Sequence, residues 1–239
     1  MLAAGYQEHG QWYPSDRGTP QGGVVSPLLS NLLLTPFDRE MRRRGYQLTR
    51  YADDWVVTCR TRQEAIRVLR EAEKVLTTLG VTLNREKTRI VHVRKGFEFL
   101  GYKIKRGERP LRLSASKRTS GVTYGSLYAY PTDKSVRRFR DHVRALTRRR
   151  APVTTAELVE DLNPLIRGWG QYYKKAHVRT LFHRLDGWIV RRIRSHRYKR
   201  WRNAGWTTLP THRLREEFGL VALTHLIPSL PSRSRARPR

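Results

Sequence analysis

Several residue types are scarce in this sequence, and each scarcity narrows what the chain can be. Cys59 is the only cysteine among 239 residues, which excludes a disulfide framework and any zinc site built on cysteine pairs. No apolar run approaches the roughly 20 residues that a membrane-spanning helix needs. The start, Met1–Tyr6, is too short and not basic enough for a secretory signal. These absences predict a soluble protein of the reducing cytoplasm that makes no use of a membrane.

Acidic residues are also few, because 20 Asp and Glu stand against 49 Lys and Arg, for a net charge of +29. Residues 1–100 hold 16 basic and 11 acidic residues, and residues 101–239 hold the other 33 and 9. The two parts therefore carry net charges of +5 and +24. Such an excess repels itself unless a polyanion neutralises it. It predicts a nucleic-acid partner, gripped mainly by the C-terminal part.

The N-terminal part alternates between helical and strand-like patterns. The apolar stretch Val24–Phe37, behind the turn cluster Gly18–Gly23, predicts a buried helix with Pro27 in its first turn. The stretch Tyr46–Cys59 predicts a β-hairpin with acidic residues at its tip. A capping box at Thr61 predicts a helix that ends near residue 80, and short strands are expected at 81–83, 90–93 and 97–104.

The C-terminal part is helical in pattern. Residues 105–131 show no sustained period and predict a connecting segment or an extended ribbon. Helices are expected at 136–146 and at 181–193. A further helix between them is expected to begin at the Thr154 capping box and to be interrupted near Asn163-Pro164. The predicted domains are 1–110, mixed α and β; 111–131, a linker; 132–227, a helical bundle; and 228–239, a disordered basic tail.

Two adjacent carboxylates, Asp53 and Asp54, occupy the predicted hairpin tip. Side by side they repel each other, and a divalent cation would relieve that repulsion. Mg²⁺ suits hard oxygen ligands and takes one or two protein carboxylates together with water and substrate phosphates. The dipeptide alone favours an ordinary solvated turn, so the metal assignment depends on the surrounding motifs.

The surrounding motifs occur in a fixed order along the chain. Tyr51-Ala52-Asp53-Asp54 follows the loop Gly18–Gly23 and precedes Leu83–Thr88 and Phe99–Tyr102. Together they resemble the palm of a group II intron reverse transcriptase. The segment Asn163–Trp169 with Tyr172-Tyr173 resembles the maturase-specific thumb, or X domain, of the same family. The resemblance covers nearly the whole chain and implies an α+β partial reverse-transcriptase palm followed by an all-α basic helical thumb domain.

The resemblance also implies roles for individual residues. Asp53 would be a catalytic metal ligand and Asp54 a supporting catalytic and metal-binding acid. The residues that would contact the nucleotide or template are Gln21, Gly22, Tyr51 and Lys87, and those that would cradle the primer end are Phe99, Leu100 and Gly101. Each has an ordinary structural alternative: a turn for Gln21, a packed strand aromatic for Tyr51, a solvated side chain for Lys87, and a core strand with a glycine bulge for the primer segment.

The thumb-like part is expected to bind intron RNA, because its positive charge exceeds what solubility requires. Its candidate RNA contacts are Arg167, Lys174, Lys175, Arg191, Arg192, Arg194, Arg197 and Lys199. Trp169, Tyr172 and Tyr173 stand at helical spacing, which favours packing between helices over stacking on bases. The implied partners are group II intron RNA, an RNA template with a DNA primer, and deoxynucleotides.

The sequence departs from the family in one respect. A two-metal site needs carboxylates from separate strands, and the family takes one from a strand well before the Pro-Gln-Gly loop. Here the only acid ahead of Tyr13 is Glu8, in no strand-like context, and the fingers are missing. We therefore expect the C-terminal portion of such an enzyme, with an incomplete Mg²⁺ site, no appreciable polymerase activity alone, and an N-terminal fragment as a further partner.

Two other interpretations remain open from the sequence. One is a non-catalytic RNA-binding splicing factor that keeps the thumb and uses the palm as scaffold. The other is a decayed intron remnant that does not fold stably, because a palm without its first strands exposes sheet edge and core. An adjacent upstream reading frame for the fingers and the first palm strand would favour a split enzyme over both.

Overall fold

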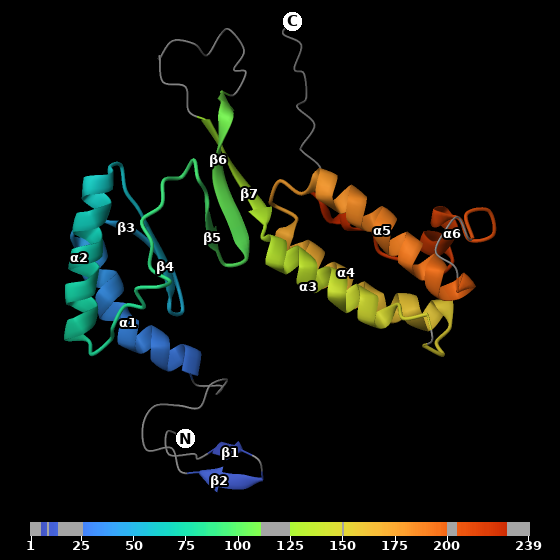
Figure 1. The fold of residues 1–239 in the computed structure, drawn as a ribbon, viewed down its shortest axis with the longest axis horizontal. Helices are drawn as coiled ribbons and strands as arrows, with labels where there is room; N and C mark the ends of the chain where they lie inside the picture. The colour runs from blue at the N-terminus through green and yellow to red at the C-terminus, as the bar shows by residue number, and fades with distance from the viewer. Residues whose placement is uncertain are drawn as a thin grey trace, which may run out of the picture. The chain divides into compact units, whose positions relative to one another are not determined.

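The computed structural model of the chain describes residues 6–8, 10–13, 26–110, 125–149, 151–199 and 205–228. They form helices and small sheets (Figure 1), as the predicted mixture of α and β requires. The chain divides into two compact units, residues 1–92 and 93–239, each with its own hydrophobic core. No helix of the described residues is long and apolar enough to cross a membrane.

A short hairpin opens the first unit. Strands β1 (Tyr6–Glu8) and β2 (Gln11–Tyr13) are antiparallel, with Glu8 paired to Gln11 across Gly10. Gly10 has a φ of +82°, a left-handed conformation that glycine adopts without strain. The sequence interpretation that Glu8 has no strand context is therefore wrong, because a glycine turn pairs segments too short to show a period.

Helix α1 (Ser26–Arg43) runs six residues beyond its predicted end, and Pro27 lies in its first turn as expected. Its buried residues Leu34, Phe37 and Met41 share one stripe at helical spacing. By contrast, three other leucines of the helix are exposed: Leu28 at 69%, Leu32 at 72% and Leu33 at 49%. The predicted buried helix is thus buried along one stripe only, because one hairpin and one helix cover one side of it.

The predicted hairpin and second helix are both confirmed. Strands β3 (Gln47–Tyr51) and β4 (Asp54–Thr58) are antiparallel, and helix α2 (Arg62–Thr78) follows. The Thr61 side chain accepts the Glu64 backbone N–H at the start of α2. Both helices contact the hairpin, and the core between them contains Leu34, Phe37, Met41, Leu48, Val68, Ala72 and Leu76.

The strands predicted at 81–83 and 90–93 do not form. At the first of these segments the backbone bonds locally instead: the Val81 N–H donates to the Leu76 carbonyl, which closes the end of α2. The Asn84 side chain then accepts the N–H groups of Glu86 and Lys87 at 3.0 and 3.1 Å. An Asx turn therefore replaces the expected ladder, because asparagine supplies the acceptor that a partner strand would otherwise provide.

A three-stranded antiparallel sheet opens the second unit. Its order is β5 (Phe97–Phe99), β6 (Tyr102–Pro110) and β7 (Gly125–Pro131). The end of the predicted linker is therefore a strand, and it belongs to the same compact unit as the helices that follow it. The compact units divide at 92/93 rather than within 111–131, because β6 pairs with β7 and β7 leads directly into the first helix of the bundle. Residues 111–124 lie outside the described chain.

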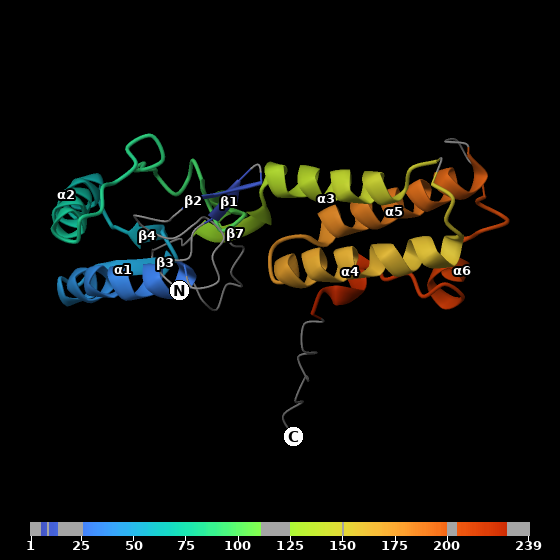
Figure 2. The ribbon, with the colours of Figure 1, turned by 90° about the horizontal axis from the view of Figure 1, so that it is seen from below.

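Helices α3 (Asp133–Leu146), α4 (Thr155–Tyr173) and α5 (Arg179–Tyr198) lie side by side in both views (Figures 1 and 2). The short helices α6 (Thr211–Glu216) and η2 (Leu223–Leu226) complete the bundle. The Thr154 capping box is present at the start of α4. The predicted tail beyond residue 228 lies outside the described residues.

The interruption predicted at Asn163-Pro164 is wrong, because α4 continues through both residues. Asn163 donates to the Gly219 carbonyl at 3.1 Å and accepts the Val221 N–H at 2.9 Å. Leu162 and Ile166, on either side of the proline, are buried in the core. Tertiary packing thus offsets the hydrogen bond that Pro164 cannot make.

Candidate functional site

The turn Ala52–Asp54, which we call the acid turn, joins β3 to β4. Asp53 and Asp54 are both exposed, and Asp54 pairs across the hairpin with Tyr51. Ala52 has a φ of +53°, an uncommon conformation for a residue with a side chain. One Arg50 nitrogen donates to the Ala52 carbonyl at 2.7 Å and to the Asn31 side chain at 3.0 Å. Arg50 therefore holds the turn in this conformation.

Arg50 is in turn fixed by Asp38 of helix α1. Its Nε and Nη2 donate to the two carboxylate oxygens of Asp38, each at 2.7 Å. The side chains are only 7% and 16% exposed, so the pair is bidentate and largely desolvated. The Asp38 carboxylate raises the pKa of Arg50 above its usual value. This tether was not predicted: an arginine beside an acid turn was a visible signal, but its partner lies twelve residues away in a helix.

Magnesium is the metal implied for the acid turn, where the Asp53 and Asp54 carboxylates would be its protein ligands. Two adjacent, exposed carboxylates match the one or two that Mg²⁺ usually takes from protein, the rest of its shell being water and phosphate oxygens. Within the described ranges, no group of three or more His, Cys, Asp or Glu side chains is placed to hold a metal ion. Asp53 and Asp54 thus suit one edge of a shared site, not a closed protein cage.

The other predicted nucleotide contacts are placed unequally. Tyr51 is 66% exposed at the end of β3, so it is not the packed strand aromatic of the alternative interpretation. Lys87 is exposed in the Asn84 turn of the same unit. Gln21 and Gly22 lie outside the described residues. Of the two members of this set that the structure describes, Tyr51 lies next to the acid turn and Lys87 lies in a different turn.

The predicted primer segment lies in the other compact unit. Leu100 and Gly101 form the turn between β5 and β6, with φ of +48° and +74°. The Leu100 carbonyl accepts the Tyr172 hydroxyl at 2.7 Å, and the Gly101 carbonyl accepts the Tyr173 hydroxyl at 3.1 Å. A Cβ at residue 101 would lie 2.7 Å from that Tyr173 oxygen. The turn is thus bound to the end of α4, and residue 101 must be glycine for the Tyr173 hydroxyl to come this close. Phe99, before the turn, pairs with Tyr102 after it.

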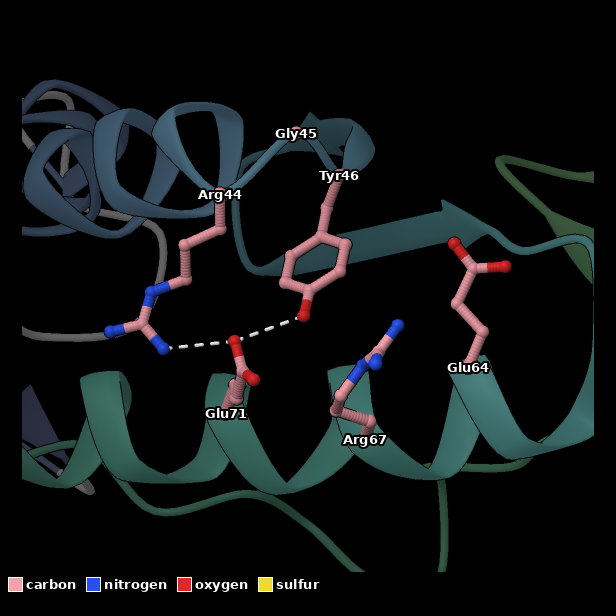
Figure 3. A pocket seen from close by; sticks show the side chains of 6 residues that line it. All are labelled: Arg44, Gly45, Tyr46, Glu64, Arg67 and Glu71. Atoms are coloured by element: carbon pink, nitrogen blue, oxygen red, sulfur yellow. Dashed lines mark hydrogen bonds and ion pairs between the residues drawn. The ribbon is translucent and has the colours of Figure 1, made fainter.

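A pocket of about 550 Å³ lies between the end of α1 and helix α2 (Figure 3). Its lining includes Arg44, Tyr46 and Glu71, which are joined by hydrogen bonds of 2.9 and 3.0 Å to one Glu71 oxygen. Arg44 lowers the pKa of Glu71, and burial raises the pKa of Tyr46. None of the predicted site residues lines this pocket. These partners are already satisfied by one another, so the arrangement attaches α1 to α2.

The predicted RNA contacts divide into exposed residues and packed ones. Arg167, Lys175, Arg191, Arg197 and Lys199 are exposed, and Lys174 is half-buried with a hydrogen bond to Gln171. The Lys199 ammonium also donates to the Arg149 carbonyl. These six residues, which we call the basic surface, come from the second half of α4, the loop after it, and α5.

Arg192 and Arg194 have packing roles that the sequence did not predict. Arg192 donates to the Thr147 hydroxyl and carbonyl at 2.8 and 2.9 Å, which caps the end of α3, and its burial lowers its pKa. Arg194 is 6% exposed and donates to the Leu209 carbonyl at 3.0 Å. Its guanidinium also lies 5.1 Å from the Trp206 ring. Both guanidinium groups are therefore used inside the bundle, and we leave them out of the basic surface.

The aromatic residues of α4 mostly pack, as their spacing predicted. The Trp169 ring lies 4.5 Å from that of Phe139, and its Nε1 donates to the Ser135 hydroxyl at 3.1 Å. Tyr173 is 4% exposed in the bundle core. Tyr172 is the exception, with 52% of its surface exposed although its hydroxyl bonds Leu100.

Two segments of the chain match family models of known proteins. Residues 1–104 match a family described as reverse transcriptase (RNA-dependent DNA polymerase), and residues 136–214 match the group II intron, maturase-specific domain. Protein YkfC of Escherichia coli is 31% identical over 43% of this chain and 36% of its own length.

Two further relatives are named for a group II intron and for a reverse transcriptase. The group II intron-encoded protein LtrA of Lactococcus lactis is 25% identical over 44% of this chain and 28% of its own length. The retron Mx65 reverse transcriptase of Myxococcus xanthus is 41% identical over 29% of this chain and 17% of its own length. The chain thus spans about a third or less of the curated relatives that it matches.

Proposed function

Because this chain belongs to the group II intron reverse transcriptase/maturase family, we propose that its second unit binds intron RNA for splicing and that its acid turn supplies magnesium ligands of a reverse transcriptase site. One observation carries the proposal: a reverse transcriptase match and a maturase-specific match follow each other in one chain. Intron RNA, an RNA template with a DNA primer, and deoxynucleotides are the partners we propose.

RNA binding is assigned to the basic surface. Five of its six residues are exposed over α4, the following loop and the end of α5, and Lys174 is half-buried. There lysine and arginine can contact phosphates without giving up a partner in the core. The charge of +24 over residues 101–239 supports the same assignment. Since each phosphate contact releases counterions, affinity should fall steeply as salt is raised.

Asp53 and Asp54 are assigned to metal binding. When bound, Mg²⁺ would neutralise phosphate charge and stabilise the oxygens that attack and leave in nucleotide transfer. The protein's own part is positional: Arg50 and Asp38 hold the acid turn, and Tyr51 presents an exposed ring beside Asp54. We also propose that Phe99, Leu100 and Gly101 contact the primer, and that Lys87, Gln21 and Gly22 contact the nucleotide or template.

The RNA assignment is tested by binding of the purified chain to a group II intron RNA and to a random RNA of equal length across a salt series. Tighter binding to the intron at physiological salt is the expected result. Lys175→Gln and Arg197→Gln should each lower the affinity and reduce the salt slope by about one contact. Arg85→Gln, which removes one charge from an 84% exposed side chain of the first unit, is the matched control. Equal and weak binding to both RNAs would overturn the assignment.

A non-catalytic RNA-binding splicing factor is the second candidate function. It is favoured by the fact that, in the described part of the chain, no third acidic, His or Cys side chain joins the two carboxylates of the acid turn. Titration with Mn²⁺, followed by the loss of the free-ion paramagnetic resonance signal, separates the two candidates.

We expect the Asp53→Asn/Asp54→Asn double variant to bind fewer Mn²⁺ ions than the wild type. Glu86→Gln, at an exposed turn carboxylate of the same unit, should leave the titration unchanged. If the double variant titrates like the wild type while intron RNA binding persists, the metal assignment fails and the splicing-factor function remains.

A further inference from the structure

One face of the second unit's sheet carries aromatic and basic side chains that no motif accounts for. In the β6–β7 register, Lys103 lies opposite Tyr130 and Lys105 opposite Tyr128. Residues directly opposite each other in an antiparallel pair point to the same face, and so do residues two apart along a strand. All four side chains therefore share one face of the sheet.

The rings on this face are ordered by the backbone next to them. The Tyr128 and Tyr130 rings lie 6.1 Å apart with an interplanar angle of 14°. The His177 ring, from the loop between α4 and α5, lies 4.7 Å from Tyr128 and 5.8 Å from Tyr130. The His177 N–H donates to the Ala129 carbonyl at 2.9 Å, and His177 Nδ1 accepts the Ala129 N–H at 3.3 Å. The loop thus extends the edge of β7 and adds a third ring.

The position of the Tyr128 ring depends on a glycine in the neighbouring strand. A Cβ at Gly107 would lie 2.3 Å from Cε2 and 3.0 Å from Cδ2 of that ring. Gly107 does not have the positive φ that would itself demand glycine. Its missing side chain therefore makes room for the ring to lie across strand β6.

This face is not the one that packs in the core. Tyr130 is 41% exposed, and Lys103, Lys105 and His177 are exposed, with Tyr128 half-buried between them. Among the described residues, the apolar side chains packed against the bundle core include Tyr102 but neither Tyr128 nor Tyr130. The exposed parts of the two tyrosine rings are therefore available to a partner outside the bundle core.

The charge around the rings indicates what would cover them. Lys103 and Lys105 flank the tyrosines, and Lys174 and Lys175 precede His177 in its loop. Glu98 of β5, opposite Lys103, is the acidic side chain of the described sheet on this face. Ring faces bordered by ammonium groups match the two chemistries of single-stranded nucleic acid: bases that stack and phosphates that attract cations.

We propose that this tyrosine platform, made of Lys103, Lys105, Tyr128, Tyr130 and His177, stacks unpaired bases of a single-stranded nucleic acid. The proposal rests on the proposed function in taking nucleic acid as the partner. It adjoins the basic surface at Lys174 and Lys175 but differs from it in chemistry, because it stacks unpaired bases on rings and would not recognise a duplex.

The test uses a single-stranded oligonucleotide that contains 2-aminopurine, whose fluorescence is quenched when it stacks on an aromatic ring. The full chain should quench the probe, and Tyr130→Ala should reduce quenching and weaken binding at least about fivefold, the effect of losing one stacked base. Tyr130→Phe should bind like the wild type, because stacking requires the ring and not the hydroxyl. Leu127→Ala is the matched control, since Leu127 is 59% exposed on the opposite face of the same strand.

A second variant tests the geometry without altering any side chain of the platform. Gly107→Ala should displace the Tyr128 ring and weaken binding of the single-stranded probe. A duplex RNA of the same length should bind as before. Thermal melting of each variant checks that the sheet remains folded.

The outcomes separate this proposal from the proposed function. Equal quenching by the wild type, Tyr130→Ala and Leu127→Ala would overturn the platform, even if intron RNA were preferred over random RNA. Quenching that depends on Tyr130, in a protein without preference for intron RNA, would support the platform and overturn the maturase assignment instead.

Discussion

The two compact units use charged side chains in different ways. In the first unit, Arg50 is buried against a carboxylate, and Arg44 is shared between Glu40 and Glu71. In the second unit, the buried guanidinium of Arg194 and the half-buried one of Arg192 donate to carbonyl and hydroxyl oxygens. The unit with nearly balanced charge thus pairs these two arginines with its own carboxylates. The strongly basic unit has too few acids to pair most of its cations, which are therefore available to an external anion.

One buried acid of the second unit likewise has backbone and hydroxyl partners. Asp186, on α5, is 8% exposed and accepts the backbone N–H groups of Leu223 and Thr224 at 2.8 and 3.1 Å, together with the Thr224 hydroxyl at 2.8 Å. It therefore holds the start of η2 and pairs with no arginine in the described structure. Where acids are few, this one stabilises backbone donors.

The largest effect is expected when the Asp38–Arg50 ion pair of the first unit is broken. Arg50→Ala or Asp38→Ala leaves its partner desolvated without a counter-charge, which should cost about 3 kcal/mol or more of unfolding free energy. Hydrogen exchange of the α2 amides in the full chain, followed across a denaturant series, measures this loss in the first unit. Arg85→Ala, at a pair with 84% and 41% exposed side chains, should change stability little.

A double variant Asp38→Ala/Arg50→Ala should be more stable than either single variant, since no charge is then left buried. Single and double variants of equal stability would show that solvent reaches this pair, and the contrast with the exposed pair would disappear.

A smaller effect is expected from the carboxylate of the second unit. Asp186→Ala removes three accepted hydrogen bonds and leaves buried N–H groups unsatisfied, for a loss of about 2 kcal/mol. Hydrogen exchange should become faster at Leu223 and Thr224, and stay unchanged in α2. Asp161→Ala, at an exposed acid of α4, is the control. Unchanged exchange at Leu223 would remove the role assigned to Asp186.

The smallest expected effect is a pH-dependent change in stability caused by Glu157 of the second unit. Glu157 accepts the Thr154 backbone N–H and hydroxyl, and these bonds lower its pKa from 4.5. A lowered carboxylate pKa contributes stability above the unfolded value, and that contribution is lost as the pH falls through the folded value. Glu157→Gln should therefore be less stable than wild type at pH 7, and the difference should shrink as the pH falls below 4.5 and through the lowered pKa of folded Glu157. A difference that does not vary with pH would exclude this cause.

Local signals predicted part of the fold, and non-local pairing accounts for the rest. The hairpin around Asp53 and the helix after Thr61 were expected, because turn and cap residues act on their immediate neighbours. Strand β7 was missed, since its partner β6 lies beyond a long intervening segment. The continuity of α4 through Pro164 depends on Asn163 bonding residues 56 and 58 positions away.

The candidate site follows the same division. Asp53 and Asp54 were identified from a short motif, whereas the Asp38–Arg50 tether that holds them is formed between a helix and a strand. Arg192 and Arg194 looked like surface charges because their sequence is dense in arginine. Only their position on the buried side of α5 shows that they bond Thr147 and Leu209.

The hydrogen bonds that fasten the β5–β6 turn to α4 have a consequence for synthesis on the ribosome. Leu100 and Tyr172 are 72 residues apart, as are Gly101 and Tyr173. At about 5–20 residues per second, the turn would wait roughly 4–14 s for its helical partner to be made. The acid turn needs only Asp38 and Arg50, both translated before it. The nascent chain can therefore complete the acid turn first, while β5 and β6 are available to any chaperone that reaches them.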